Sequence, residues 1–145
     1  MAKSARLTLR AATGELERLR SWLESLGQAY QLSDRVMFQL DLCLTELVTN
    51  VINYAYPVAS APEEAVAVQV TRNPANLLVE VTDQGVGFDP VAYVPRPRAQ
   101  SLEEAEAGGR GLLLVRKFAT ELQYRREQGC NRLSFILPAP PERIC

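Results

Sequence analysis

Three polar side chains are spaced so that they share one face of a predicted helix. Glu46, Asn50 and Asn53 are four and three residues apart, and a helix returns such positions to nearly the same side. The apolar neighbours Cys43 and Leu47 put this face at the margin of a buried stripe. A carboxylate and two amides there could position a water or hold a divalent cation, because Mg²⁺ prefers oxygen ligands. Taken alone, the pattern is more typical of a solvated polar face.

A second group of residues follows a predicted strand over 77–82. Asp83 comes directly after this strand, and Gly85 and Gly87 follow at every second position. Glycines allow a sharp turn and a close approach of the backbone to a flat ligand. The ionised Asp83 can accept a hydrogen bond from an amino group such as an exocyclic amine. Taken alone, this pattern is more typical of an ordinary turn rich in Asp and Gly.

A third group, Gly108 to Gly111, is glycine-rich and precedes a predicted helix. Free amide N–H groups at a helix start, together with the helix dipole, can bind an anion such as phosphate, and Arg110 adds a positive charge. The group is not a Walker A loop, because no GK[ST] follows. It is not a dinucleotide fingerprint either, because it follows an acidic segment and not a strand. A flexible hinge is the simpler interpretation of this group alone.

The composition excludes several kinds of chemistry. The chain has no histidine, which removes Ser/His/Asp and Cys/His nucleophiles, histidine phosphotransfer by the chain itself and most zinc enzyme sites. Acid–base work must then fall to carboxylates. The formal net charge of −1 argues against a nucleic-acid partner, which would require a cationic face.

The cysteines and the hydropathy pattern predict a cytoplasmic protein. The three cysteines are widely spaced and form neither a CxxC pair nor a disulfide framework, which favours a reducing compartment. The N-terminal residues include no apolar signal region, and no run approaches the ~18 apolar residues of a membrane span.

The elements that position these groups follow from the spacing of apolar residues. Strands are expected over 6–10, 66–70, 77–82, 122–126 and 132–137, the last two forming a hairpin around residues 129–131. One helix is expected from Leu16 to a stop at Gly27, a second from Ser33 to about Tyr56, and a third over 112–119. This order lacks regular βαβ alternation. It predicts an α/β (α+β) two-layer sandwich, with a mixed or antiparallel sheet and helices on one face.

The chain length of 145 residues predicts a single domain over 1–145. Residues 90–108 contain prolines and then an acidic run without strong periodicity, which is more typical of a functional lid than of a plain connector. A proline-rich tail follows over 138–145.

The three groups, in this order and at this separation, resemble the motifs of the GHKL (histidine kinase-like) ATPase superfamily. Within it, the chain is most similar to the small bacterial anti-sigma-factor serine/threonine kinases. Residues 46–56 (ELVTNVINYAY) resemble the N box, 83–90 (DQGVGFDP) the first glycine box and 108–116 (GGRGLLLVR) the second. The resemblance extends from the first strand to Leu137 and implies an ATP-binding fold of the GHKL type.

The resemblance implies a role for each site residue. Asn50 would ligate the Mg²⁺ that bridges the ATP phosphates, Glu46 would be the general base for the attacking hydroxyl, and Asp83 would bind the adenine amino group. The residues that would shape the adenine pocket are Gly85 and Gly87, and those that would hold the phosphates under the lid are Gly109, Arg110 and Gly111.

Two positions depart from the N-box pattern. Asn53, counted here among the nucleotide-binding residues, stands where a basic residue is frequent, so that phosphate contact is either missing or supplied by Arg110. Tyr54 stands where a histidine is frequent.

The function implied by the resemblance is that of an ATP-dependent protein serine kinase. It would phosphorylate a STAS-domain anti-anti-sigma protein, sequester a sigma factor when free of that partner, and form a homodimer without contacting nucleic acid or a membrane. Two alternatives stay open. One is a nucleotide-binding switch without significant phosphotransfer, against which Glu46 argues. The other is the catalytic module of a histidine-kinase-type system acting in trans.

Overall fold

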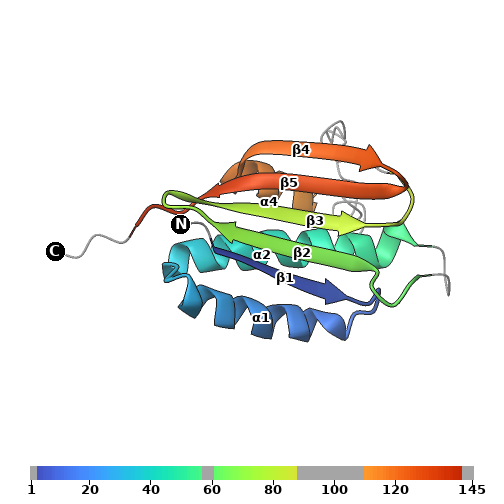
Figure 1. Cartoon of the computed structure of the whole chain (residues 1–145), viewed down its shortest axis with the longest axis horizontal. Coiled ribbons are helices and arrows are strands. Elements are labelled where there is room, and N and C mark those ends of the chain that lie inside the picture. The colour runs from blue at the N-terminus through green and yellow to red at the C-terminus, as the bar shows by residue number, and fades with distance from the viewer. Residues whose placement is uncertain (1–2, 57–60, 88–109, 142–145) are drawn as a thin grey trace.

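Five strands form one sheet in the order β1-β2-β3-β5-β4, and every neighbouring pair is antiparallel (Figure 1). The structure is a computed structural model that describes residues 3–56, 61–87 and 110–141. The strands are β1 (Lys3–Leu9), β2 (Val66–Arg72), β3 (Asn76–Asp83), β4 (Thr120–Glu127) and β5 (Cys130–Pro138). The helices are α1 (Glu15–Ala29), α2 (Asp34–Asn50), its π-helical continuation η1 (Val51–Ala55) and α4 (Arg110–Phe118).

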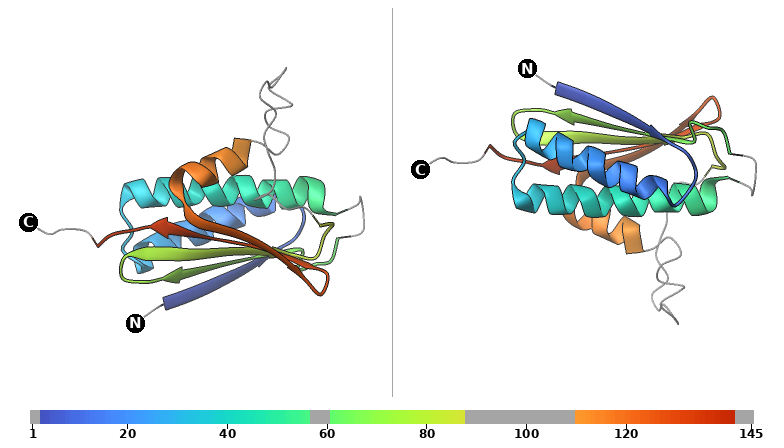
Figure 2. Two further views of the ribbon diagram at one scale, coloured as in Figure 1. Left: turned by 90° about the horizontal axis from the view of Figure 1, so that it is seen from above. Right: turned by 90° about the horizontal axis from the view of Figure 1, so that it is seen from below.

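The helices all cover the same face of the sheet (Figure 2). The expected α+β sandwich with helices on one face is therefore confirmed, and within the described residues the sheet is antiparallel throughout. Every helix and strand expected from the sequence is present, with ends that differ by a few residues. The expected lid (90–108) and the last residues of the tail (142–145) lie outside the described residues.

The core lies between the sheet and the helices. Alternate positions of the central strands are buried in it: Val66, Val68 and Val70 of β2, Leu77, Val79 and Val81 of β3, and Leu133, Phe135 and Leu137 of β5. This period of two is what a half-buried strand requires. The buried stripe of α2 packs against them and consists of Val36, Leu40, Cys43, Leu44, Leu47 and Val48.

The sequence correctly predicted where α2 begins but not where α1 ends. As expected, α2 begins after Ser33, whose Oγ accepts a hydrogen bond from Val36 N–H at 3.2 Å. The expectation that the first helix stops at Gly27 is wrong, because α1 continues to Ala29. Gly27 is buried, and a Cβ added there would lie 2.4 Å from Met37 Sδ. This glycine therefore allows two helices to pack closely and does not end one.

The β4–β5 hairpin has a shorter turn than the sequence predicted. Its turn consists of Gln128 and Gly129, which have φ values of 52° and 77°. Two consecutive positive φ values are typical of the two-residue turns that match the twist of a hairpin. Cys130 and Asn131, expected within the turn, belong to β5 instead. Asn131 consequently occupies a strand position whose side chain points toward the helices.

Candidate functional site

Asp83 is a buried carboxylate at the end of β3. It continues the inward row of that strand and is only 8% exposed. Its Oδ1 accepts hydrogen bonds from Gly85 N–H at 2.8 Å and from Asn131 Nδ2 at 2.9 Å. Such bonds are what a buried carboxylate needs to offset the loss of water. No donor within the described residues bonds the second oxygen, Oδ2, which is therefore available to an external donor.

Asn131 lies opposite Asp83 in the β3–β5 register and is 6% exposed. Its Nδ2 also donates to Val86 O at 2.8 Å, while its Oδ1 accepts from the Tyr124 hydroxyl and from Arg126 Nη1 at 2.8 Å. Sequence reasoning missed this residue. The signal was an amide two positions before the alternating apolar residues of β5, in the same inward row.

The turn after Asp83 is packed against the end of the helix that carries Glu46. Val86 N–H donates to Ala55 O at 2.8 Å. A Cβ added to Gly85 would lie 2.2 Å from Ala55 O and 2.6 Å from Ala55 Cβ, so only glycine fits there. Two motifs that are about 30 residues apart in the sequence are thus in direct contact.

Tyr56, the residue after η1, also links the end of this helix to the turn after Asp83. Its hydroxyl accepts a hydrogen bond from Gln84 N–H at 2.8 Å and donates one to Ala65 O. Burial raises the pKa of the Tyr56 phenol above its usual value, although the bond from Gln84 acts in the opposite direction. The phenol therefore keeps the proton that it shares with Ala65.

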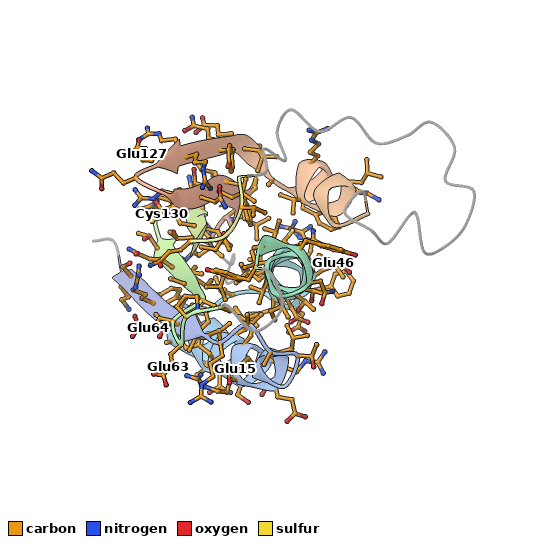
Figure 3. All side chains as sticks on the ribbon, turned by 90° about the vertical axis from the view of Figure 1, so that its right-hand side faces the viewer. Glu15, Glu46, Glu63, Glu64, Glu127 and Cys130 are labelled. Atoms are coloured by element: carbon orange, nitrogen blue, oxygen red, sulfur yellow. The ribbon has the colours of Figure 1, made fainter. Side chains whose placement is uncertain are left out.

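Glu46 and Asn50 lie on the last turns of α2, partly buried and about 6 Å apart along the helix axis. In Figure 3, Glu46 is on the side of α2 that is turned away from the strands, the side on which α4 lies. Asn53 differs from both, because it lies in η1, is exposed to solvent and follows π-helical spacing. Single π turns within helices are frequent at functional sites.

The expected phosphate-binding residues lie at the start of α4, which begins at Arg110 and continues through Gly111. Gly109 lies outside the described residues. The helix packs on α2, and its N-terminal end lies beside the middle of α2 (Figure 2). The unpaired N–H groups of a helix N-terminus and its dipole favour an anion at this place.

The last turns of α2 carry oxygen-bearing side chains of the kind that Mg²⁺ binds. The described residues include no group of three or more His, Cys, Asp or Glu that could hold a metal ion. Mg²⁺ commonly takes only one or two protein ligands and completes its shell with water and phosphate oxygens. An amide oxygen from Asn50, with Glu46 one turn away, meets that requirement.

Comparisons with known proteins agree with this geometry. The family model of the histidine kinase-like ATPase domain matches residues 9–137. The serine/threonine-protein kinase BtrW of Bordetella bronchiseptica is 32% identical over 121 residues, which cover 83% of this chain and 84% of that protein. Separately, no helix within the described ranges is long and apolar enough to cross a membrane.

A solved structure shares the fold. The crystal structure of the RsbU and RsbW domains of a Mycobacterium tuberculosis protein matches 99% of this chain with a TM-score of 0.61 and 17% sequence identity. The match covers 34%, about a third, of the chain in that crystal structure. The chain thus belongs to the histidine kinase-like ATPase family, and the curated relative that it matches within that family is a serine/threonine-protein kinase.

Proposed function

We propose that this chain is an ATP-dependent protein serine kinase that phosphorylates a STAS-domain protein in a partner-switching system. ATP binding follows from membership of an ATPase family. One observation carries the proposal: the turn that holds Asp83 contacts the end of the helix that bears Glu46 and Asn50. This contact supports a site that runs from Asp83 along the preceding turns of the helix, where Asn50 and Glu46 lie.

At the adenine end, Asp83 would accept a hydrogen bond from the exocyclic amino group through its unengaged Oδ2. Guanine has a carbonyl at the corresponding position, and an acceptor that faces a buried acceptor loses about 1–3 kcal/mol or more. Gly85 and Gly87 would shape the adjoining pocket, because their lack of a side chain lets the turn pack closely against Ala55 and Arg126. The site is therefore expected to prefer ATP to GTP.

At the phosphate end, the N-terminus of α4 would bind the phosphates through its backbone N–H groups, with Gly109, Arg110 and Gly111. Asn50 would ligate Mg²⁺, which when bound neutralises phosphate charge. Asn53 would contribute a weaker polar contact, because it is exposed on η1 and carries no charge.

Glu46 would take the proton from the serine hydroxyl as its oxygen attacks the γ-phosphorus. The bond between the γ-phosphorus and the β–γ bridging oxygen breaks, and ADP leaves with that oxygen. Positioning and electrostatics supply most of the acceleration in phosphoryl transfer. A positioned general base typically contributes about 10²–10⁴-fold.

The partner is the part of the proposal that lies farthest from the site. The Mycobacterium relative joins an RsbW domain to an RsbU domain in one chain, which supports a partner-switching context for this fold. We assign a STAS-domain substrate, a sigma factor as the protein bound in its absence, and a homodimer that acts in the cytoplasm without nucleic acid or membrane.

The test is phosphotransfer to a STAS-domain protein encoded in the same genome. Incubation with ATP and Mg²⁺ should produce phosphoserine, detected by intact mass and peptide mapping. Glu46→Gln should reduce the rate by about 10²–10⁴-fold while ATP affinity, measured by calorimetry, stays within about twofold. Glu24→Gln is the matched control, because Glu24 is an exposed carboxylate on α1 outside the site.

Other outcomes would select the alternatives. Nucleotide-dependent binding of the partner without any phosphate transfer would identify a switch protein. An acid-labile phosphohistidine on a partner would identify a histidine-kinase module that acts in trans. Equal transfer rates for the wild type and Glu46→Gln would exclude Glu46 as the general base.

A further inference from the structure

We propose that Arg126 is a positioning residue of this site, which holds Asn131 and the turn after Asp83 in the orientation that presents Asp83 Oδ2 to the base. The inference rests on the proposed function, because it assumes that Asp83 binds adenine. It adds a residue on β4, a strand that contributes to none of the three motifs.

Arg126 reaches across the hairpin to the Asp83 turn. Its Nη1 donates to Gly85 O at 3.1 Å and to Asn131 Oδ1 at 2.8 Å. Its aliphatic part lies against Gly87, where an added Cβ would be 3.1 Å from Arg126 Cδ and 3.2 Å from Nε. One side chain of an edge strand thereby contacts both glycines of the turn.

The chemistry of the guanidinium fixes the orientation of the Asn131 amide. A guanidinium only donates hydrogen bonds, so the atom of Asn131 that faces Arg126 must be the oxygen. The Tyr124 hydroxyl also bonds this oxygen, but a hydroxyl can donate or accept and would tolerate either orientation. Arg126 therefore fixes the orientation from the oxygen side of the amide, as the acceptors Asp83 Oδ1 and Val86 O do from the nitrogen side.

The orientation of Asn131 decides what Asp83 can offer. With its oxygen on Arg126, Asn131 turns Nδ2 toward Asp83 Oδ1 and Val86 O. The opposite orientation would put an amide oxygen against both of these acceptors. The observed arrangement engages Oδ1 fully and leaves Oδ2 for an external amino group. Fixing a binding group in this way before the ligand arrives increases affinity, because less ordering is needed on binding.

The test compares variants of two adjacent arginines. Arg126→Met removes the donors and keeps much of the side-chain length. Arg126→Lys keeps the charge but not the planar fork. Arg125→Met is the matched control, since Arg125 is the adjacent residue, is mostly exposed and, among the described residues, bonds only Glu127, at 3.4 Å. The dissociation constants of ATP and GTP are measured for each variant by calorimetry, together with the urea midpoint.

We expect Arg126→Met to weaken ATP binding about tenfold, which corresponds to the loss of one hydrogen bond to a charged group. GTP affinity should change little, so the ATP/GTP preference should fall. Arg126→Lys should recover only part of that preference, and Arg125→Met should match the wild type. The preference is the decisive measurement, because a purely structural role would lower the urea midpoint and leave the ratio of the two affinities unchanged.

Three results would overturn the inference. They are an unchanged ATP/GTP preference in Arg126→Met, full recovery by Arg126→Lys, and an equal loss in Arg125→Met. The variant Asp83→Asn separates these results from a failure of the proposed function. If Asp83→Asn loses the adenine preference and Arg126→Met does not, only the inference about Arg126 is wrong. If the wild type itself shows no preference, the assignment of Asp83 is wrong.

Discussion

The two ends of the β3–β5 strand pair are each closed by an arginine, yet only one end has the features of a binding site. Figure 1 shows the β2–β3 turn at one end of the sheet, and the end of β3 beside the β4–β5 turn at the other. At the first end, Arg72 Nη1 donates to the backbone oxygens of Ala139 at 2.7 Å and Asn73 at 3.1 Å. At the second, Arg126 bonds Gly85 O and Asn131 Oδ1.

The two ends differ in whether a hydrogen-bond acceptor near the arginine is left without a donor among the described residues. Around Arg72 the polar groups bond one another: Asn73 Nδ2 donates to Asn76 Oδ1 at 3.1 Å, and Ala139 N–H donates to Ala75 O at 3.0 Å. Around Arg126 the same kind of bonding surrounds a carboxylate that retains one unengaged oxygen. An arginine that bonds backbone carbonyls therefore stabilises a strand end in both places. Only at the second end do the described residues leave an oxygen of a buried carboxylate, Asp83 Oδ2, without a donor, and this oxygen is the basis of the proposed ligand site.

The largest effect is expected from Gly85→Ala. The added Cβ would lie 2.2 Å from Ala55 O, so the turn and η1 must separate, which breaks the bond from Val86 N–H to Ala55 O. We expect the free energy of unfolding to fall by about 3 kcal/mol, as for a severe overpacking, and ATP binding to weaken more than tenfold. Urea denaturation and calorimetry measure the two quantities.

Gly14→Ala is the control for this substitution. Gly14 precedes α1 with φ −62°, and a Cβ added there would meet nothing within 4 Å. The stability of the Gly14→Ala variant should stay close to that of the wild type. If Gly85→Ala also behaved like the wild type, the close contact between the turn and η1 would be absent in solution.

Local spacing in the sequence was sufficient to predict the helices and strands. It was also sufficient to predict on which of them, and near which end, Asp83, Gly85, Glu46 and Asn50 lie. Each of these depends on a period, or on a motif of a few residues, within one element. The sequence pattern could not predict that Gly27 continues a helix, because the reason is Met37 on another helix.

Contacts between strands also could not be predicted from the sequence. Asn131 and Arg126 join the site only through the β3–β5–β4 register, which aligns Asp83 with Asn131 and Asn131 with Arg126. The direction of Asn53 depends on a π turn, which shifts the helical spacing after Asn50. Long-range pairing and local changes in helix type leave no period in the sequence from which they could have been predicted.

Arg72→Met is expected to have an intermediate effect, which is confined to the free energy of unfolding. The variant leaves backbone oxygens of Asn73 and Ala139 without their charged donor, so the free energy of unfolding should fall by about 2 kcal/mol. ATP affinity should not change, because these oxygens are at the opposite end of the sheet from Asp83. Urea denaturation and calorimetry again separate the two.

Arg6→Met is the matched control, because Arg6 is exposed on the neighbouring strand β1. It should change neither quantity. Arg72→Met and Arg126→Met are thus expected to differ in kind, the first in stability and the second in nucleotide preference. A loss of ATP affinity in Arg72→Met would show that the two ends are coupled, and the contrast between them would fail.

The smallest effect concerns the core that both ends share, and it is confined to alkaline pH. Cys43 is fully buried on α2, and burial raises the pKa of its thiol from 9.0 to about 12. Because the folded-state pKa is the higher one, the unfolded chain loses this proton first, and stability is lost as the pH rises above 9.

Between pH 8 and pH 10, this difference should lower the free energy of unfolding by about 1.4 kcal/mol, one pKa unit of linkage. The window stops at pH 10 because burial also raises the pKa of Tyr30 and Tyr56, whose own contributions grow around that pH and are the same in the wild type and in Cys43→Ala. Cys43→Ala should be less stable at both pH values but should lack this pH-dependent component, as urea denaturation at pH 8 and pH 10 would reveal. The same slope in both proteins would mean that the thiol meets solvent in the folded state.

A change in the common core lowers stability without favouring either end of the sheet. Cys43→Ala therefore provides the reference for a purely global loss of stability, against which the selective effect of Arg126→Met on nucleotide preference is judged.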